Sequence, residues 1–309
     1  MDLRVFGVHT VLELAPVLLA VERLSGGKAQ VSNGGVAHLG GAGQPQQASV
    51  SATRPINSPP PLQGSGLADV ATNAETQALR LSLDRPDLRI IMTVSEGLYR
   101  IVARRSAGIA SVRDLAGKRV GTFPWTSAAF YLHKELKNAG LTDDAVDIRG
   151  ISPPGELSKA LINGAVDAIA IWEPASQEAF DALGADAIEL RTPGLYREVF
   201  NLNTTADKLA DPTRRRQIVE LVRAVVVACR DITERPEAVW PLTERTTGYR
   251  PELIRASWPH HRFVGTMAPD LLDVMVEEEK WIARERGRQA RPRDELAKLI
   301  DGSVLREAS

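Results

Sequence analysis

DLRIIMTVSEGLYRIVARRSAG, residues Asp87–Gly108, is the stretch of this sequence that decides the fold. The apolar residues Ile90–Met92 and Val94 predict a strand that is buried on both faces. Ser95-Glu96-Gly97 predicts a break, after which Leu98–Ala103 resumes an extended pattern. A long strand interrupted by a single glycine is typical of a crossing between two α/β lobes. We therefore expect the residues before this stretch to build one lobe, and those after it to build a second lobe and then return.

The rest of the chain supports this division. Short strands alternate with helices, which predicts parallel sheets joined by right-handed crossovers and hence an α/β fold. Glu198–Thr205 is a second extended segment and the candidate return crossing. The predicted lobes are residues 1–97 with 203–309 (lobe I) and residues 98–202 (lobe II).

One long segment lacks this alternation. Residues 33–66 are rich in Gly, Pro, Ser and Gln and are predicted to form an irregular loop within lobe I, after a short strand at about Ala29–Val31. A loop of this length is unusual inside a compact domain. It is either a lid over the ligand or a mobile surface loop, and we favour the surface loop.

Composition excludes several classes of function. The chain has 309 residues, 43% of them hydrophobic and 25% charged, which is ordinary for a globular protein of about two domains. A net charge of −1 gives no basic footprint for nucleic acid or for an anionic membrane. No apolar run reaches the roughly 18 residues that a membrane-spanning helix needs. We expect a monomer that contacts membranes at most peripherally.

The sequence carries no motif for a metal, a cofactor or a known catalytic mechanism. It lacks a P-loop, a GxSxG elbow and a CxxC pair, and its histidines do not occur at HxxxH or HExxH spacing. We therefore predict no catalytic residues, no metal site and no cofactor. The single cysteine, Cys229, lies in the apolar run Ile218–Cys229 and is expected to be a core residue rather than a nucleophile.

Short loops that follow predicted strands are the candidate binding site, because ligands of open α/β sheets bind at the carboxyl ends of strands. Most of these loops lead into a helix, whose first N–H groups can hold an anionic group. Asn73 is expected to cap one such helix. The predicted ligand-binding residues are His9, Thr10, Asn73, Glu75, Thr76, Ser95, Glu96, Gly97, Trp125, Thr126, Ser127, Trp172 and Glu173.

Several segments carry a resemblance to a known family. They are Leu14–Ala20 (LAPVLLA), Ala68–Ala71 (ADVA), Asp114–Gly121 (DLAGKRVG), Asp167–Pro174 (DAIAIWEP) and, in the tail, Trp281 with Leu296–Leu305 (LAKLIDGSVL). In their order and spacing the chain resembles the solute-binding proteins of ABC importers for sulfonates, taurine, nitrate and thiamine precursors, together with the related thiamine-pyrimidine synthases. The resemblance covers nearly the whole chain.

This resemblance implies the type II periplasmic-binding-protein fold. Such a protein has two α/β lobes with mainly parallel sheets, one antiparallel crossing strand in each lobe, and a ligand in the inter-lobe cleft, which closes about a hinge. The resemblance implies a solute-binding protein that captures a small polar or heteroaromatic ligand for an ABC importer, with an ABC permease as partner and no chemistry of its own.

The chain departs from the family in two respects. Residues 33–66 replace the strand and helix that members usually have there, and residues 1–20 lack the pattern of an export signal. We expect a periplasmic or extracytoplasmic protein if an export signal precedes residue 1, and a cytoplasmic protein as the sequence stands.

The alternative hypothesis is an enzyme on the same fold, desulfinase or hydrolase-like, that acts on a small aromatic substrate in the cytoplasm. Its acid/base candidates are His9, Glu13 and Glu96. Desulfinases of the group use a Cys near the first ligand loop, whereas the loop His9–Glu13 holds none. The pyrimidine synthases use an active-site His and a Cys-rich segment, which this one-cysteine chain lacks. A ligand-sensing module is a weaker third hypothesis, because no helix-turn-helix accompanies the lobes.

The side chains of the predicted loops favour one class of ligand. Carboxylates suit an amine or an amidine-like ring nitrogen, and indole rings stack on flat rings or cations. These side chains are Glu75, Glu96, Glu173, Trp125 and Trp172. They favour a heteroaromatic amine, such as a pyrimidine-like ring, over a simple alkylsulfonate. Two alternatives stay open: one or two carboxylates cap helices or pair with Arg100 and Arg104, and the tryptophans pack between the lobes.

Overall fold

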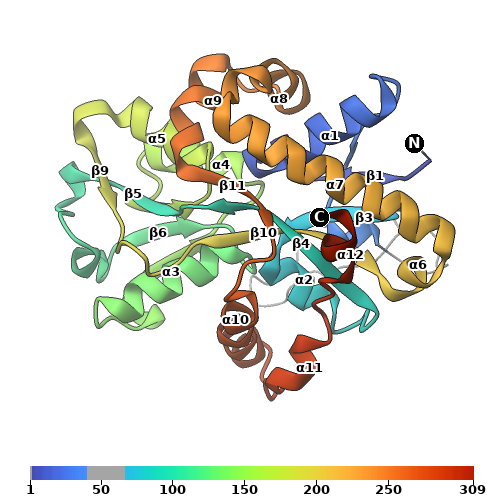
Figure 1. Cartoon of the computed structure of the whole chain (residues 1–309). Helices are drawn as coiled ribbons and strands as arrows, with labels where there is room; N and C mark the ends of the chain where they lie inside the picture. Colours follow the sequence, from blue (N-terminus) through green and yellow to red (C-terminus); the bar gives the residue numbers. More distant parts are fainter. Residues whose placement is uncertain (1, 40–66) are drawn as a thin grey trace. The chain divides into compact units, whose positions relative to one another are not determined.

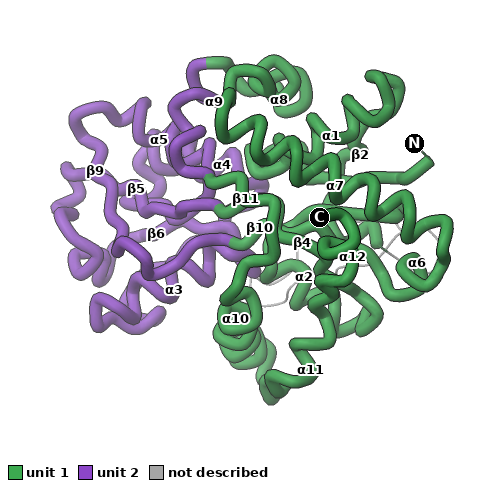
Figure 2. Tube along the Cα trace, in the orientation of Figure 1, with its two compact units in different colours: residues 1–96, 199–251, 262–309 green, residues 97–198, 252–261 purple. Residues whose placement is uncertain are grey.

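The computed structural model describes residues 2–39 and 67–309. It divides into two compact units (Figure 2): unit 1 comprises residues 1–96, 199–251 and 262–309, and unit 2 comprises residues 97–198 and 252–261. The lobes expected from the sequence, 1–97 with 203–309 and 98–202, have boundaries close to these, but the contacts group residues 252–261 with unit 2. Those lobe boundaries stay a prediction.

The described part of unit 1 is built on a six-stranded sheet with the strand order β11-β4-β10-β3-β1-β2 (Figure 1). The strands are β1 (Val5–Gly7), β2 (Ser32–Asn33), β3 (Val70–Ala74), β4 (Leu88–Gly97), β10 (Glu198–Thr205) and β11 (His261–Thr266). Strand β1 pairs in parallel with β2 and β3, whereas β10 runs antiparallel to β3. The carboxyl ends of β1 and β3 therefore lie at the same edge of the sheet.

Helices cover this sheet. They are α1 (Ala15–Ser25), α2 (Glu75–Leu81), α6 (Ala206–Ala210), α7 (Pro212–Glu234), α8 (Trp240–Thr247), α10 (Leu271–Glu285), α11 (Arg293–Ala297) and α12 (Ser303–Ala308). The long helix α7 packs along α1 and α12 (Figure 1). Its buried face, which includes Ile218, Val222 and Val225, explains why this segment folds as an amphipathic helix. Among the described residues, no helix is long and apolar enough to cross a membrane.

Unit 2 has a five-stranded sheet with the order β7-β6-β8-β5-β9. Its strands are β5 (Arg100–Arg104), β6 (Arg119–Thr122), β7 (Asp147–Gly150), β8 (Ala168–Ile171) and β9 (Ala187–Leu190), and its helices are α3 (Ser127–Asn138), α4 (Gly155–Ile162), α5 (Ala175–Leu183) and, from residue 252, α9 (Pro251–Ser257). Strand β6 is parallel to β7 and β8, whereas β5 is antiparallel to β8 and β9. The expected α/β fold with two sheets is confirmed, and β5 is the expected antiparallel crossing strand of this unit.

Short 3₁₀ helices connect these elements. They are η1 (Leu12–Leu14), η2 (Val36–His38), η3 (Arg105–Ala107), η4 (Val112–Leu115), η5 (Asp143–Ala145), η6 (Gly184–Asp186), η7 (Pro236–Ala238) and η8 (Trp258–His260).

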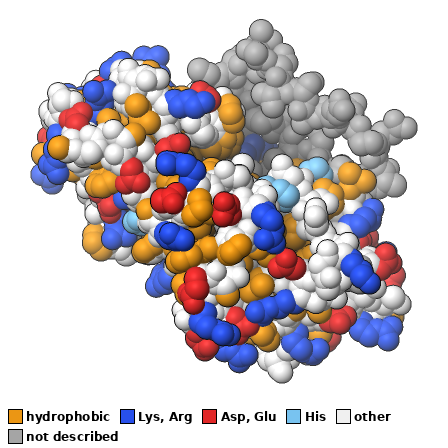
Figure 3. Space-filling model, turned by 90° about the horizontal axis from the view of Figure 1, so that it is seen from above, with side chains coloured by type: hydrophobic (Ala, Val, Ile, Leu, Met, Phe, Trp, Pro, Cys, Tyr) orange, Lys and Arg blue, Asp and Glu red, His pale blue; other side chains and the backbone are white. Residues whose placement is uncertain are grey.

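On the face seen in Figure 3, acidic and basic side chains are interspersed. This distribution agrees with the net charge of −1.

The expected break at Ser95-Glu96-Gly97 is wrong, because these residues are the last three of β4. Polar residues continue the strand here because their side chains find partners. The Ser95 hydroxyl donates to the Glu13 carbonyl at 3.1 Å, and the Glu96 carboxylate lies 2.7 Å from the guanidinium of Arg262. The break falls instead at Leu98-Tyr99, where the Leu98 N–H donates to the His260 carbonyl at 2.8 Å.

Two further local predictions are wrong. Asn73 does not cap a helix: it lies inside β3, its side-chain oxygen accepts from the Ala74 N–H at 2.9 Å, and Ala74 occupies the N-cap position of α2. The strand expected at about Ala29–Val31 is instead β2, so Asn33, Val36 and His38 have regular structure within the segment predicted to be irregular. The remainder of that segment, residues 40–66, lies outside the described residues.

Candidate functional site

The carboxyl ends of β6 and β8 form one edge of the unit 2 sheet. These strands are parallel neighbours, with Thr122 paired to Ala170, so the loops that follow them leave the sheet on the same side. Trp125–Ser127 follow β6 and lead into α3, and Trp172-Glu173 follow β8 and lead into α5. The structure therefore brings the five predicted residues of these two loops to one edge, which we call the unit 2 edge.

Aromatic rings gather at the unit 2 edge. The Trp172 ring lies 5.8 Å from Phe123 and 6.3 Å from Tyr99, measured between ring centroids. Tyr99 also makes edge contacts with Tyr131 and Tyr196, both at 5.8 Å. Tyr99 and Tyr131 are buried, whereas Trp172 and Phe123 are half-buried. Partly accessible rings on a buried aromatic floor make a rigid surface on which a flat ligand ring can stack.

A chain of polar groups passes through this aromatic cluster. The Tyr99 hydroxyl and the Ser127 hydroxyl are 2.9 Å apart, and the Ser127 hydroxyl donates to the Glu198 carboxylate at 3.3 Å. All three side chains are buried. Sequence reasoning missed Tyr99 and Glu198 as site residues, although both lie in the two crossing segments that it had singled out.

The Glu173 carboxylate is held by a buried ion pair. It lies 2.8 Å from the Arg100 guanidinium, and these side chains are 3% and 4% exposed. The Gln177 N–H donates to the other Glu173 oxygen at 2.9 Å, and Arg100 also pairs with Glu189 at 2.9 Å. Burial raises the pKa of the Glu173 carboxyl, and the Arg100 charge acts against this rise. For Glu173, the alternative of a carboxylate paired with Arg100 is what the structure shows.

Glu75 and Glu96 also have partners within the protein. Glu75 is fully buried and accepts a hydrogen bond from the Val199 N–H at 3.0 Å. Glu96 pairs with Arg262, whose side chain is 57% exposed. The Glu96 side chain is 9% exposed, so its carboxylate needs a partner, but Arg262 can return to water when another cation takes its place. Glu96 can therefore exchange its partner at less cost than Glu173, whose partner Arg100 is 4% exposed.

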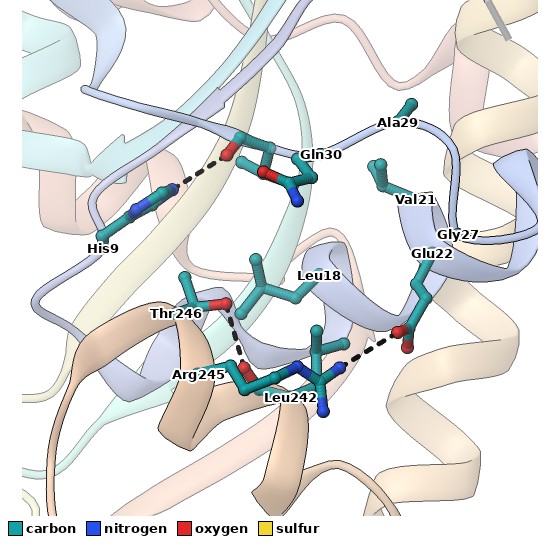
Figure 4. Close-up of a pocket in the computed structure, with 11 residues that line it drawn as sticks. His9, Leu18, Val21, Glu22, Gly27, Ala29, Gln30, Leu242, Arg245 and Thr246 are labelled. Carbon is teal, nitrogen blue, oxygen red and sulfur yellow. Dashed lines mark hydrogen bonds and ion pairs between the residues drawn. The ribbon is translucent and has the colours of Figure 1, made fainter.

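The first loop of unit 1 places its two predicted residues in different surroundings. His9 Nε2 lies 2.9 Å from the Val31 carbonyl oxygen, and the His9 N–H donates to the Asn33 side chain at 3.2 Å. Thr10 is exposed, and its carbonyl accepts from the Tyr249 hydroxyl at 3.1 Å. His9 lines a cavity of unit 1 (Figure 4), whereas Thr10 is not among the residues that line it.

Four further predicted residues lie at or near the ends of strands and helices. Thr76 is buried in the first turn of α2, and its hydroxyl has no hydrogen-bond partner among the described residues. Gly97 ends β4 at the start of unit 2. Thr126 is the N-cap of α3 and accepts from the Ala128 N–H at 3.3 Å. Trp125 has a φ of 64°, in the left-handed region that residues other than glycine seldom occupy.

The described residues do not assemble a metal site. Within 2–39 and 67–309, no three His, Cys, Asp or Glu side chains come together in a way that could hold a metal ion. Cys229 is buried in α7, where its thiol lies 3.5 Å from the Val94 carbonyl and burial raises its pKa to about 12. The expectation that Cys229 is a core residue is confirmed.

Solved structures with the same fold include both binding proteins and an enzyme. The periplasmic aliphatic sulphonate binding protein SsuA from Escherichia coli matches with a TM-score of 0.71 and 15% identity over 96% of each chain. The periplasmic nitrate-binding protein NrtA from Synechocystis PCC 6803 matches with a TM-score of 0.71 and 14% identity over 99% of this chain and 88% of NrtA. The desulfurization enzyme DSZB matches with a TM-score of 0.63 and 16% identity over 98% of each chain.

Identities this low show a shared fold and no more. The family itself is shown by a sequence match, because the model of the family described as "NMT1/THI5 like" matches residues 49–239, more than half of the chain. The superfamily to which the sequence segments pointed is therefore confirmed, and this chain belongs to the NMT1/THI5-like family.

Proposed function

We propose that this chain is a solute-binding protein that captures a small heteroaromatic or polar ligand and delivers it to an ABC importer. The observation that carries the proposal is the unit 2 edge, where half-buried Trp172 and Phe123 rest on the buried Tyr99 ring. This surface suits stacking of a flat ring. Family membership and the shared fold support the proposal, since most of the similar structures quoted above are binding proteins.

We propose Glu96 as the residue that recognises an amine on the ligand. Glu75 and Glu173 are occupied by buried partners, whereas Glu96 pairs with the exposed Arg262 side chain. An amino group that displaces Arg262 keeps the carboxylate paired, so the exchange leaves no buried charge alone. This choice refines the preference for a heteroaromatic amine over an alkylsulfonate.

Titration calorimetry with 4-aminopyrimidine, unsubstituted pyrimidine and ethanesulfonate tests both proposals. Trp172→Ala should weaken the aminopyrimidine at least tenfold, because the stacking surface is lost. Glu96→Gln should weaken the aminopyrimidine but not the unsubstituted ring. Arg262→Gln is the matched control: it removes the competing Arg262 charge, so the amine should bind as well as before or better. Tight ethanesulfonate binding that is unaffected by Trp172→Ala would show that the site is misplaced.

The competing function is an enzyme, and DSZB shows that a protein of this fold can be one. The chain's only cysteine argues against a thiolate mechanism, because Cys229 is buried and its pKa is raised to about 12. An enzyme would therefore have to use His9, Glu13 or Glu96. Incubation of the protein with biphenyl-2-sulfinate and with small aromatic amides, followed by chromatography, separates the two functions. Product formation that is lost in His9→Ala but retained in Cys229→Ser would favour the enzyme.

The partner, the compartment and the oligomeric state belong to the same proposal. We expect an ABC permease as partner, an extracytoplasmic location and a monomer. Cell fractionation tests the location, the genes beside this one test for permease and ATPase, and sedimentation tests the monomer.

Hinge closure predicts that a bound ligand lowers the radius of gyration in small-angle scattering. A native protein confined to the cytoplasm would contradict the importer role.

A further inference from the structure

Unit 1 contains a cavity that the proposed function does not use. It has a volume of about 380 Å³, near the lower end of the roughly 300–1,000 Å³ typical of small-molecule sites. Helix α1, residues 27–31 and helix α8 surround it (Figure 4), and all of its lining residues belong to unit 1. His9 is the one residue that it shares with the loops predicted from the sequence.

The floor of the cavity is apolar. Leu18, Val21 and Val31 are buried, with 6%, 1% and 5% of their surface exposed, and Leu242 of α8 is half-buried. Figure 4 shows the Leu18 side chain at the centre of the space, between α1 and α8. A branched or aromatic hydrocarbon group placed here would move from water to an apolar surface, which favours binding.

Two opposite charges meet at one side of the cavity. The Arg245 guanidinium lies 3.2 Å from the Glu22 carboxylate, and the side chains are 63% and 40% exposed (Figure 4). Among the described residues, Glu22 is the one side chain that pairs with Arg245. An exposed pair of this kind contributes little stability, so a ligand can replace it at small cost. Guanidinium has five N–H donors in a fork that matches a carboxylate.

The opposite side of the cavity offers neutral polar groups. The Gln30 amide points into the space in Figure 4, where it can both donate and accept a hydrogen bond. The Thr246 hydroxyl is already bonded to the Leu242 carbonyl at 2.9 Å, and His9 Nε2 to the Val31 carbonyl at 2.9 Å. The features of the cavity that remain available to a ligand are therefore the apolar floor and the exchangeable pair of opposite charges beside it.

We propose that this cavity binds a free α-amino acid with an apolar or aromatic side chain. The ammonium group pairs with Glu22, the carboxylate pairs with Arg245, and the side chain lies over Leu18 and Leu242. The zwitterion thereby replaces one ion pair with two, and neither protein charge is left alone. A ligand with only one of the two charges would leave Glu22 or Arg245 without its partner.

Calorimetric titration of the full chain with L-phenylalanine and L-leucine tests the proposal. Both should bind at one site per chain. 3-Phenylpropionate and phenethylamine, which each keep only one charge, should bind at least tenfold more weakly than phenylalanine. Glu22→Gln and Arg245→Gln should each weaken phenylalanine at least tenfold. Leu18→Trp, which fills the cavity, should abolish binding, and thermal unfolding without ligand reports whether each variant is folded.

Two variants serve as controls. Arg23→Gln removes the neighbouring ion pair with Asp231, which has a 2.7 Å contact and starts from the same helix but lies outside the cavity, and it should leave phenylalanine binding unchanged. Trp172→Ala should also leave it unchanged, so the result does not depend on the proposed function. Absence of phenylalanine binding at millimolar concentration would overturn the proposal. So would equal binding of phenethylamine and phenylalanine by the Trp172→Ala variant, or phenylalanine binding that survives both charge-removing variants.

Discussion

Trp125 holds a backbone conformation that few residues other than glycine adopt. Its φ of 64° lies between β6 and α3, at the loop proposed to contact the ligand. Strain of this kind typically costs about 1–3 kcal/mol and is concentrated at functional sites. We infer that the Trp125 ring has a role at this position, because the backbone conformation alone would favour glycine.

Glycine at this position should therefore relieve strain. We expect Trp125→Gly to be more stable to unfolding than Trp125→Ala by about 1 kcal/mol, because both lose the ring and only glycine accepts this φ at no cost. Urea unfolding of the two variants measures the difference. At an ordinary position the order is reversed, so an alanine variant as stable as the glycine variant, or more so, would show that Trp125 is not strained.

His260 makes the stability of unit 2 depend on pH. Burial, followed by the Arg100 charge, lowers its pKa from 6.5 to about 4, and the charges of Glu189, His261 and Arg191 also act on it. The Glu173 carboxylate lies 3.9 Å away, but its charge is taken up by Arg100 at 2.8 Å. The folded protein thus keeps His260 neutral at a pH where the unfolded chain is protonated.

The sign follows from this difference. Between pH 6.5 and about 4 the unfolded chain binds one proton more, so the free energy of unfolding falls as the pH is lowered through this window. The loss is on the order of 2 kcal/mol. We expect His260→Gln to flatten this part of the profile, measured by urea unfolding at each pH. A variant with the wild-type slope would mean that His260 is not the group responsible.

At the scale of elements, one buried ion pair joins three segments of unit 2. Arg100 of β5 holds Glu173, which connects β8 to α5, and also holds Glu189 of β9. This pair fixes the backbone next to Trp172. We therefore regard Arg100 and Glu173 as residues that position the aromatic ring of the unit 2 edge.

Removal of one partner should be costly. Arg100→Met leaves the Glu173 carboxylate buried without its cation and should destabilise the protein by about 3–5 kcal/mol, whereas Arg100→Met with Glu173→Gln should recover part of the loss. The matched control is Arg119→Met, which breaks the more exposed pair of Arg119 with Asp167 in the same sheet and should cost much less. Equal losses for Arg100→Met and Arg119→Met would contradict this account.

The sequence predicted elements better than side-chain partners. The alternation of strands and helices was sufficient for the α/β fold, because period and length are local properties of the chain. The position of the first break was wrong because Glu96 continues its strand by pairing with Arg262, a residue far along the chain. Likewise, the sequence offered Arg100 only as one of several alternatives for these carboxylates, and the structure is needed to show that it neutralises Glu173. Such pairings arise only when distant segments pack together.

At the scale of the whole molecule, the same limit applies to the site. The principle that ligands bind at the carboxyl ends of strands correctly selected Trp125 and Trp172 as residues of one sheet edge, because β6 and β8 are parallel neighbours. It missed Tyr99 and Glu198, whose roles depend on the register of β5 with β8 and on a hydrogen bond from Ser127. The match of the NMT1/THI5-like family model to residues 49–239 confirms the resemblance that the sequence segments carried.

The central claim is that this protein binds a flat heteroaromatic ligand at the unit 2 edge without changing it. The most direct measurement is a calorimetric titration of the wild type and Trp172→Ala with 4-aminopyrimidine, followed by chromatography of the recovered ligand. The account predicts saturable binding by the wild type, at least tenfold weaker binding by Trp172→Ala, and ligand recovered intact. Consumption of the ligand, or equal affinity in both proteins, would contradict it.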